Sequence, residues 1–362
     1  MTNFGGGGKT PSESSGCRLS NIELLRIISM FLVVALHALF YSLGKPEQED
    51  LINHTFEMTV RTELEAFCLV CVNVFVMISG WFGIKASTKG IGKFIYQWLF
   101  LALLVIAALL LAGYRYRIKE YFSLIGSYQY YWFIYAYLFL YAISPVLNSF
   151  ALNASRQVFK QTLVMYWVFM FVFGWIEPLS YIGYGLSPIL FIGLYLTARY
   201  IHLYPSKWTN KTSRQYLIAY FFSATIAASI LLLTTRLLPN GRIVQRCYEM
   251  FMSYGNPLHV LSSVCLLLAF VKMPFQSKVV NKLAASCFAV YLVQCNAGVF
   301  DPIFKKLIIE IHSSYSGLMY PLMTLAFILF IFIISYIVDQ LRIFSYKLIF
   351  GKVRPQNLKT NK

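Results

Sequence analysis

Three ionisable residues occur within the first long apolar run of the sequence, NIELLRIISMFLVVALHALFYS. They are Glu23, Arg26 and His37. A titratable side chain inside a segment long enough to cross a membrane is energetically costly, so such residues are functional candidates. Arg26 and His37 are eleven residues apart, which is about three helical turns and roughly 16 Å along a helix axis. A helix would therefore present both on one face, with Glu23 one turn before Arg26 and able to pair with it.

His37 is the residue of this run that is best suited to chemistry. It lies well inside the run, away from the loops, and an imidazole can act as a general base or carry an acyl group as a nucleophile. The structural alternative is a core histidine that bonds a neighbouring helix. Glu23 and Arg26 lie closer to one end of the run, where an arginine can also reach lipid headgroups and act as a topology anchor.

The composition indicates that membrane-spanning helices carry these residues. Of the 362 residues, 58% are hydrophobic and 12% are charged, whereas soluble domains carry about 25% charged residues. Lipid can solvate the outer faces of such a chain. Because about 20 apolar residues cross a bilayer, we expect an all-α, polytopic membrane bundle of about ten transmembrane helices. The expected spans are residues 22–43, 64–84, 94–113, 130–150, 161–176, 181–201, 215–233, 250–271, 283–304 and 318–341.

The distribution of charge predicts that both termini are cytoplasmic. With the N-terminus inside, basic residues gather in the inside loops, and acids such as Glu57, Glu63 and Glu65 gather in the outside loops, as membrane topology favours. Residues 1–20 are expected to form a flexible tail, residues 21–342 one membrane domain, and residues 343–362 a basic cytoplasmic tail. The net charge of +17 therefore reflects membrane orientation, and we expect no nucleic-acid partner.

Two outside loops are basic, although membrane topology favours basic residues in the inside loops. One contains Arg115, Arg117 and Lys119, and the other contains Arg236, Arg242 and Arg246. These side chains either extend to the lipid headgroups or form a surface for an anionic or sugar-bearing substrate.

A C-x-x-C pair, Cys68 and Cys71, lies near the start of the second span. No second pair completes a zinc site, and buried thiols usually behave as small apolar side chains. We therefore expect no metal.

Four runs of the sequence resemble the acyltransferase-3 family, membrane proteins that O-acylate bacterial glycans. The run E-L-L-R-x10-H, which holds Glu23, Arg26 and His37, is similar to the first helix of the family. The other runs are N-V-F-V-M-I-S-G-W (73–81), Y-W-F-I-Y-A-Y-L-F-L-Y-A-I-S-P (131–145) and S-C-F-A-V-Y-L-V-Q (286–294). The resemblance touches most of the chain, and the Arg-x10-His spacing is its most specific element.

Two positions depart from the family pattern. Gln294 stands where the family run has a histidine, so any role of that side chain reduces to hydrogen bonding. The paired arginines that often follow the second span are missing. Lys89 and Lys93 occupy roughly that place, and they can bind phosphates only as point charges.

The resemblance implies an integral membrane acyltransferase of the bacterial cytoplasmic membrane. It would move an acetyl or other acyl group from acyl-CoA, most often acetyl-CoA, to a hydroxyl of a cell-surface polysaccharide or lipid-linked sugar, with no cofactor bound permanently. Arg26, Lys85, Lys89 and Lys93 would form a basic landing zone for the anionic CoA. His37 would stand deeper as the general base or acyl carrier, and Glu23 would hold Arg26. Besides the lipid bilayer, the polysaccharide-synthesis machinery is an expected partner.

Five residues of the resembling runs are expected to bind substrate by hydrogen bonds or stacking: Asn73, Ser79, Trp132, Tyr291 and Gln294. The alternatives are structural. Asn and Ser commonly hydrogen-bond between membrane helices, and Trp is common in the interfacial aromatic belt.

Two other functions are consistent with parts of the sequence. A transporter or flippase would suit ten spans with Pro188 and Pro257 inside them, but it would need intramembrane acids for ion coupling, and no chain of them is found. A catalytically decayed partner of a polysaccharide synthase would explain why Gln294 replaces a histidine.

Overall fold

The computed structural model describes residues 19–47, 49–50, 55–180, 182–238 and 241–351. Within these ranges the chain is helical and has no β-strand, which confirms the expected all-α class. The helices of the first half are α1 (Ser20–Leu36), η1 (His37–Tyr41), α3 (Thr55–Cys68), α4 (Val70–Phe82), α5 (Thr88–Leu111), α6 (Ile118–Gly126), α7 (Tyr128–Asn153), α8 (Arg156–Met170) and η2 (Phe171–Ile176). Those of the second half are η3 (Gly183–Gly185), α9 (Pro188–Leu203), η4 (Trp208–Asn210), α10 (Ser213–Leu237), α11 (Gly241–Phe251), α12 (Pro257–Val271), α13 (Lys278–Ala284), α14 (Cys287–Gln294), α15 (Ala297–Val299), η5 (Phe300–Lys305), α16 (Lys306–Ser314) and α17 (Met319–Phe350).

In the part of the chain that the structure describes, seven helical segments are long and apolar enough to cross a membrane. They are Ser20–Tyr41, Thr55–Phe82, Thr88–Leu111, Tyr128–Asn153, Arg156–Ile176, Ser213–Leu237 and Met319–Phe350. An eighth, Lys278–Gln294 with Ala297–Ser314, is bent by 66° at its break. The molecule is therefore a polytopic helix bundle. The expected count of about ten also requires the short apolar helices α9 and α12, and it stays a prediction, as does the cytoplasmic location of the termini.

Two prolines expected inside spans instead lie at helix starts. Pro188 and Pro257 occupy the first turn of α9 and α12. Proline suits this position because its missing N–H would have no helical partner there. The sixth and eighth expected spans, 181–201 and 250–271, therefore begin several residues later as the short helices Pro188–Leu203 and Pro257–Val271.

Two expected boundaries also differ. The acids placed in the first outside loop, Glu57, Glu63 and Glu65, lie on α3, which joins α4 in one apolar segment. The helix α17 continues to Phe350, so residues 343–350 of the expected tail are helical. Most of the expected N-terminal tail (1–18) and residues 352–362 lie outside the described residues.

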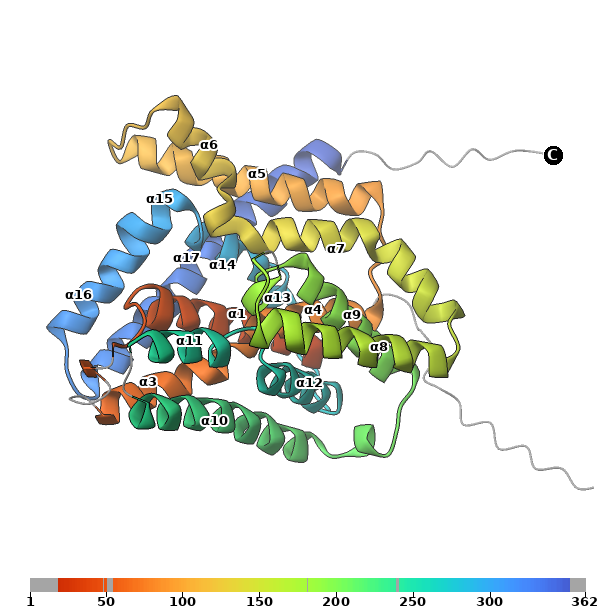
Figure 1. Cartoon of the computed structure of the whole chain (residues 1–362). Coiled ribbons are helices and arrows are strands. Elements are labelled where there is room, and N and C mark those ends of the chain that lie inside the picture. Colours follow the sequence, from red (N-terminus) through yellow and green to blue (C-terminus); the bar gives the residue numbers. More distant parts are fainter. Residues whose placement is uncertain (1–18, 48, 51–54, 181, 239–240, 352–362) are drawn as a thin grey trace, which may run out of the picture.

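The spans pack as an antiparallel bundle around α1 and α4, with α10 lying along α12 and α3 (Figure 1). At one end, which we call the basic end, α1, α5, α8, α10 and α13 begin. Four of these helices start with a Ser or Thr side chain that accepts a backbone N–H of the first turn, namely Ser87, Ser155, Thr212 and Ser277. These caps satisfy donors that a helix start leaves unpaired, and each has a Lys or Arg within two residues in the sequence.

The close approach of α4 and α9 depends on Gly80. A Cβ added there would lie 2.3 Å from the carbonyl oxygen and 2.7 Å from the Cα of Tyr195, and backbone atoms cannot move aside locally. We expect Gly80→Ala to destabilise the fold by about 1–3 kcal/mol, measured as a lower apparent Tm of the purified protein. Gly92→Ala is the matched control because its Cβ would meet no atom within 4 Å and Ala favours a helix. Equal Tm values for the two variants would contradict this role of Gly80.

Candidate active site

His37 lies where α1 changes from an α-helix to the π-helix η1. Its Nδ1 is 2.8 Å from Oε1 of Gln294 and 3.7 Å from Sγ of Cys295. The rings of Tyr41 and Phe300 contact the imidazole edge-on, with centroids 5.3 and 5.5 Å away. A widened helical turn at a titratable residue is typical of a functional site.

Gln294 fixes the tautomer of His37. It lies in the last turn of α14, just before the bend in the ninth expected span. Its Oε1 also accepts a hydrogen bond from the Cys295 thiol at 3.2 Å. Because this oxygen can only accept, Nδ1 of His37 carries the proton, and Nε2 keeps the lone pair that a base or nucleophile needs. The buried Nε2 of Gln294 has no hydrogen-bond partner among the described residues.

A cavity of about 30 Å³ adjoins His37. Two of the expected substrate-binding residues, Trp132 and Tyr291, line it, as do Met30, Val33, Val72, Phe75, Phe133, Tyr254 and Phe288. Met30 and Val33 of α1 and His37 of η1 therefore face the same cavity. The space is enough for a water molecule or two but not for a substrate, so a substrate would have to displace side chains.

The other three expected substrate-binding residues, Asn73, Ser79 and Gln294, are not among the residues that line this cavity. Asn73 is buried and donates a hydrogen bond from Nδ2 to the backbone oxygen of Tyr254 at 2.9 Å. The hydroxyl of Ser79 lies 3.0 Å from that of Tyr137. Asn73 thus holds the segment that carries Tyr254, and Ser79 joins two helices, which matches their structural alternatives.

Glu23 and Arg26 form the expected pair. Arg26 Nη1 lies 2.6 Å from Oε1 of Glu23, and the side chains are 37% and 7% exposed. The backbone oxygen of Arg26 accepts the thiol hydrogen of Cys287 at 3.3 Å, which joins α1 to the helix that carries Gln294. The guanidinium therefore remains accessible while its carboxylate partner is buried.

The three lysines of the expected landing zone lie at the basic end. Lys85 is in the loop after α4, and Lys89 and Lys93 are in the first turns of α5. All three are exposed, and Lys93 lies over the ring of Tyr346 at 5.9 Å. Phe94, next to Lys93, stacks on Phe288 of the cavity wall with centroids 5.3 Å apart.

Sequence reasoning missed Arg199, which lies near the C-terminal end of α9. Its Nη1 donates to the backbone oxygen of Trp81 at 3.2 Å, and its guanidinium carbon is 3.5 Å from the position of a Cβ at Gly83. It thus places a guanidinium at the end of the second span. A single arginine within the apolar run 181–201 was the available signal, but its neighbours are distant in sequence.

The fold and this site define a class: a membrane helix bundle with a histidine held between helices by hydrogen bonding and ring contacts. The family model described as an acyltransferase domain, acyltransferase-3, matches residues 19–339. The chain therefore belongs to the acyltransferase-3 family and is a membrane acyltransferase. No curated protein and no solved structure matches it.

Proposed function

We propose that the protein transfers an acetyl or other acyl group from acyl-CoA to a hydroxyl of a glycan or lipid-linked sugar. The observation that supports this most strongly is the hydrogen bond between His37 Nδ1 and Gln294 Oε1. It leaves Nε2 of a histidine that lies between helices ready to accept a proton. It also argues against a decayed site, because Gln294 supports His37 although it replaces a histidine.

In the proposed reaction, Nε2 of His37 takes the proton of the acceptor hydroxyl as its oxygen attacks the thioester carbonyl. The carbon–oxygen bond forms, the carbon–sulfur bond breaks, and the CoA sulfur receives the proton from His37. The N–H of Gln294 Nε2, which has no partner among the described residues, would donate to the oxyanion that develops on the carbonyl oxygen. In a covalent variant, Nε2 itself attacks the thioester carbonyl, the carbon–sulfur bond breaks and CoA leaves as the thiolate. The acyl-imidazolium then passes the acyl group to the acceptor oxygen, and the proton of the hydroxyl goes to the CoA thiolate.

The basic end is the proposed entry for the donor. CoA is strongly anionic, and Arg26, Arg199 and the three exposed lysines present positive charge there. The pantetheine arm would then pass between helices toward His37, near the contact of Phe94 with Phe288. With the basic end facing the cytoplasm of a bacterial cell, the donor would come from inside and the glycan from outside.

Arg199 offers the two-pronged phosphate recognition that Lys89 and Lys93 lack. We expect Arg199→Ala to raise KM for acetyl-CoA about tenfold with little change in kcat, because a charge-assisted hydrogen bond to a bound phosphate is lost. Arg214→Ala removes an exposed cation from the same end and serves as the control. An equal rise of KM in both variants, or none in either, would leave Arg199 without a donor-binding role.

Acetyl-CoA turnover by the purified protein in lipid nanodiscs tests the proposed function. Release of free CoA is followed with a thiol reagent, with and without cell-surface glycan extract as the acceptor. Glycan-stimulated release is expected for the acyltransferase. If CoA is not released under either condition, the transporter or non-catalytic partner functions would gain support.

A further inference from the structure

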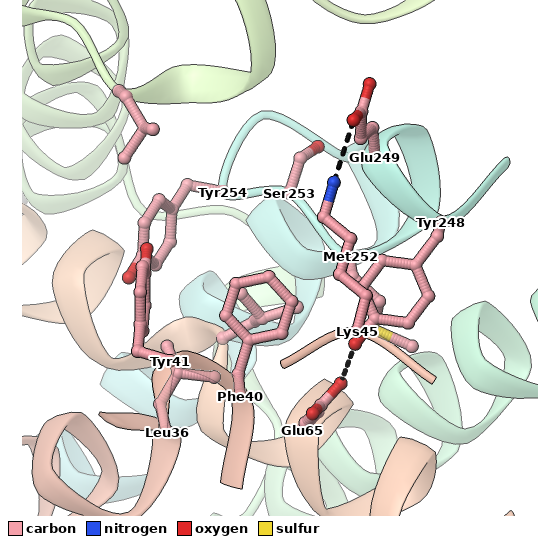
Figure 2. A pocket seen from close by; sticks show the side chains of 12 residues that line it. Leu36, Phe40, Tyr41, Lys45, Glu65, Tyr248, Glu249, Met252, Ser253 and Tyr254 are labelled. Carbon is pink, nitrogen blue, oxygen red and sulfur yellow. Dashed lines mark hydrogen bonds and ion pairs between the residues drawn. The ribbon is translucent and has the colours of Figure 1, made fainter. Parts of the chain in front are cut away.

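A second cavity opens on the side of His37 away from Arg26, between the end of α1, α3 and α11. Its volume is about 290 Å³, which is near the range of small-ligand sites. Figure 2 shows aromatic rings on its walls and charged groups at two places. Its lining residues, which we call the α11 pocket, are Leu36, Phe40, Tyr41, Lys45, Glu65, Leu69, Leu186, Tyr248, Glu249, Met252, Ser253 and Tyr254.

Aromatic faces make up much of the α11 pocket. The rings of Phe40 and Tyr248 stack almost in parallel, 5.7 Å apart with 7° between their planes, and Tyr41 meets Phe40 edge-on at 4.9 Å. The negative face of an aromatic ring attracts positively polarised hydrogens, such as those on the C–H face of a sugar. Few polar groups among aromatic walls are typical of a site that orients a small ligand.

The charged groups of the α11 pocket balance one another. Lys45 Nζ lies 2.7 Å from Oε1 of Glu249, and these side chains are 41% and 30% exposed. Deeper, the Tyr248 hydroxyl donates to the buried Glu65 carboxylate, which also faces Arg61 at 3.5 Å. Burial, with the nearby Glu65 carboxylate, raises the pKa of Tyr248 well above its usual value, so the phenol stays protonated. The pocket therefore offers hydrogen-bond donors and acceptors without an excess charge.

Two tyrosines separate the α11 pocket from His37. Tyr254 lines both this pocket and the small cavity at His37, and Tyr41 lines the pocket while its ring contacts the imidazole. Figure 2 shows the two rings side by side at one edge of the pocket. Asn73 holds the backbone of Tyr254, so a turn of the side chains alone would join the two spaces.

We propose that the α11 pocket is the acceptor site and that it binds an uncharged, hydroxyl-rich sugar, which reaches His37 when Tyr41 and Tyr254 move aside. This inference rests on the proposed function, because it names the site and the charge class of the acceptor. The aromatic faces would hold the ring of the sugar, and Lys45, Glu249 and Ser253 would bond its hydroxyls. An anionic sugar would place its carboxylate against the carboxylates of Glu65 and Glu249. The cations that could offset this repulsion, Arg61 and Lys45, are already paired with these two residues.

The test is equilibrium binding of methyl glycosides to the full-length protein in nanodiscs without acyl donor, followed by saturation-transfer NMR. The probes are the methyl glycosides of glucose, galactose, rhamnose and N-acetylglucosamine, and methyl glucuronide is the anionic counterpart. We expect at least one neutral glycoside to bind in preference to methyl glucuronide. Glu249→Gln and Phe40→Ala should each weaken that binding at least about fivefold. Glu177→Ala is the control, because it removes an exposed carboxylate that is likewise in an ion pair, with Arg246, but lies outside the pocket.

Acetyl-CoA turnover in the same preparations separates the two proposals. Weaker glycoside binding in Glu249→Gln, with binding and CoA release both at the wild-type level in Glu177→Ala, supports the α11 pocket as the acceptor site. Glu249→Gln still tests the inference if Phe40→Ala does not fold. The inference is overturned if no neutral glycoside binds, if methyl glucuronide binds as well as the neutral probes, or if both pocket variants bind like the wild type. If a neutral glycoside binds, the pocket variants weaken that binding and no CoA is released, the sugar site is supported. Only the proposed acyl-transfer reaction is then rejected.

Discussion

Alanine in place of His37 is expected to lower acyl transfer about 1,000-fold at saturating acetyl-CoA. A positioned general base contributes roughly 10²–10⁴-fold, and no other histidine is found among the residues that line the cavity or contact the His37 ring. KM for acetyl-CoA should change little, because Arg26 and Arg199 lie toward the basic end. The measurement is the initial rate of CoA release with glycan acceptor, at equal folded yield.

The matched control for this variant is His312→Ala. His312 is 38% exposed and faces Glu57, so its loss removes the same side chain at a site remote from the cavity. Its rate should remain within about twofold of the wild type, since exposed changes rarely disturb a distant site. If His37→Ala retains the wild-type rate, the assignment as an acyltransferase still holds, but His37 has no role in the reaction.

Much of the membrane architecture follows directly from composition. Long apolar segments must become helices in lipid, because every backbone polar group needs an internal partner. The spacing of Glu23 and Arg26 along one helix likewise predicts their ion pair. These predictions succeed because they depend on one continuous helix.

The features that complete the site depend on departures from regular helices. The π-turn at His37 and the break after Gln294 bring these side chains together from positions 257 residues apart. Hydropathy does not distinguish an α-turn from a π-turn, and it treats a bent span as a continuous one. The start of α12 at Pro257 has a similar effect, because it frees residues 252–256 to place Tyr254 between the α11 pocket and His37.

Arg199 and the α11 pocket were beyond sequence reasoning for another reason. Arg199 on α9 donates a hydrogen bond to the backbone oxygen of Trp81 near the end of α4. Lys45 forms an ion pair with Glu249, which is 204 residues away in the sequence. Such pairs depend on how helices are arranged around one another. Arg246 illustrates the same point: expected in a basic loop, it lies on the helix α11 and its guanidinium bonds Glu177, while Tyr248 and Glu249 of the same helix line the pocket.

Replacing Gln294 with leucine is expected to lower acyl transfer about 100-fold or more without loss of the fold. Leucine has a similar volume but cannot accept the proton of His37 Nδ1, so the tautomer with a lone pair on Nε2 is no longer enforced. The same change removes the Nε2 donor proposed for the oxyanion. Both effects act on the chemical step, so kcat should fall while KM for acetyl-CoA stays nearly constant.

Gln340→Leu and Gln294→Glu distinguish this role from simple packing. Gln340 is a partly buried amide that bonds Ser286 and Tyr336 outside the cavity, so its replacement should change the rate by no more than a few-fold. Glutamate at position 294 can still accept from Nδ1 but has lost the amide donor, so Gln294→Glu should retain more activity than Gln294→Leu if orientation of His37 dominates. Equal losses in the two Gln294 variants would instead assign most of the effect to the oxyanion donor. A wild-type rate in Gln294→Leu would exclude Gln294 from both roles, and the acyl transfer would then have to proceed without the hydrogen bond that fixes His37.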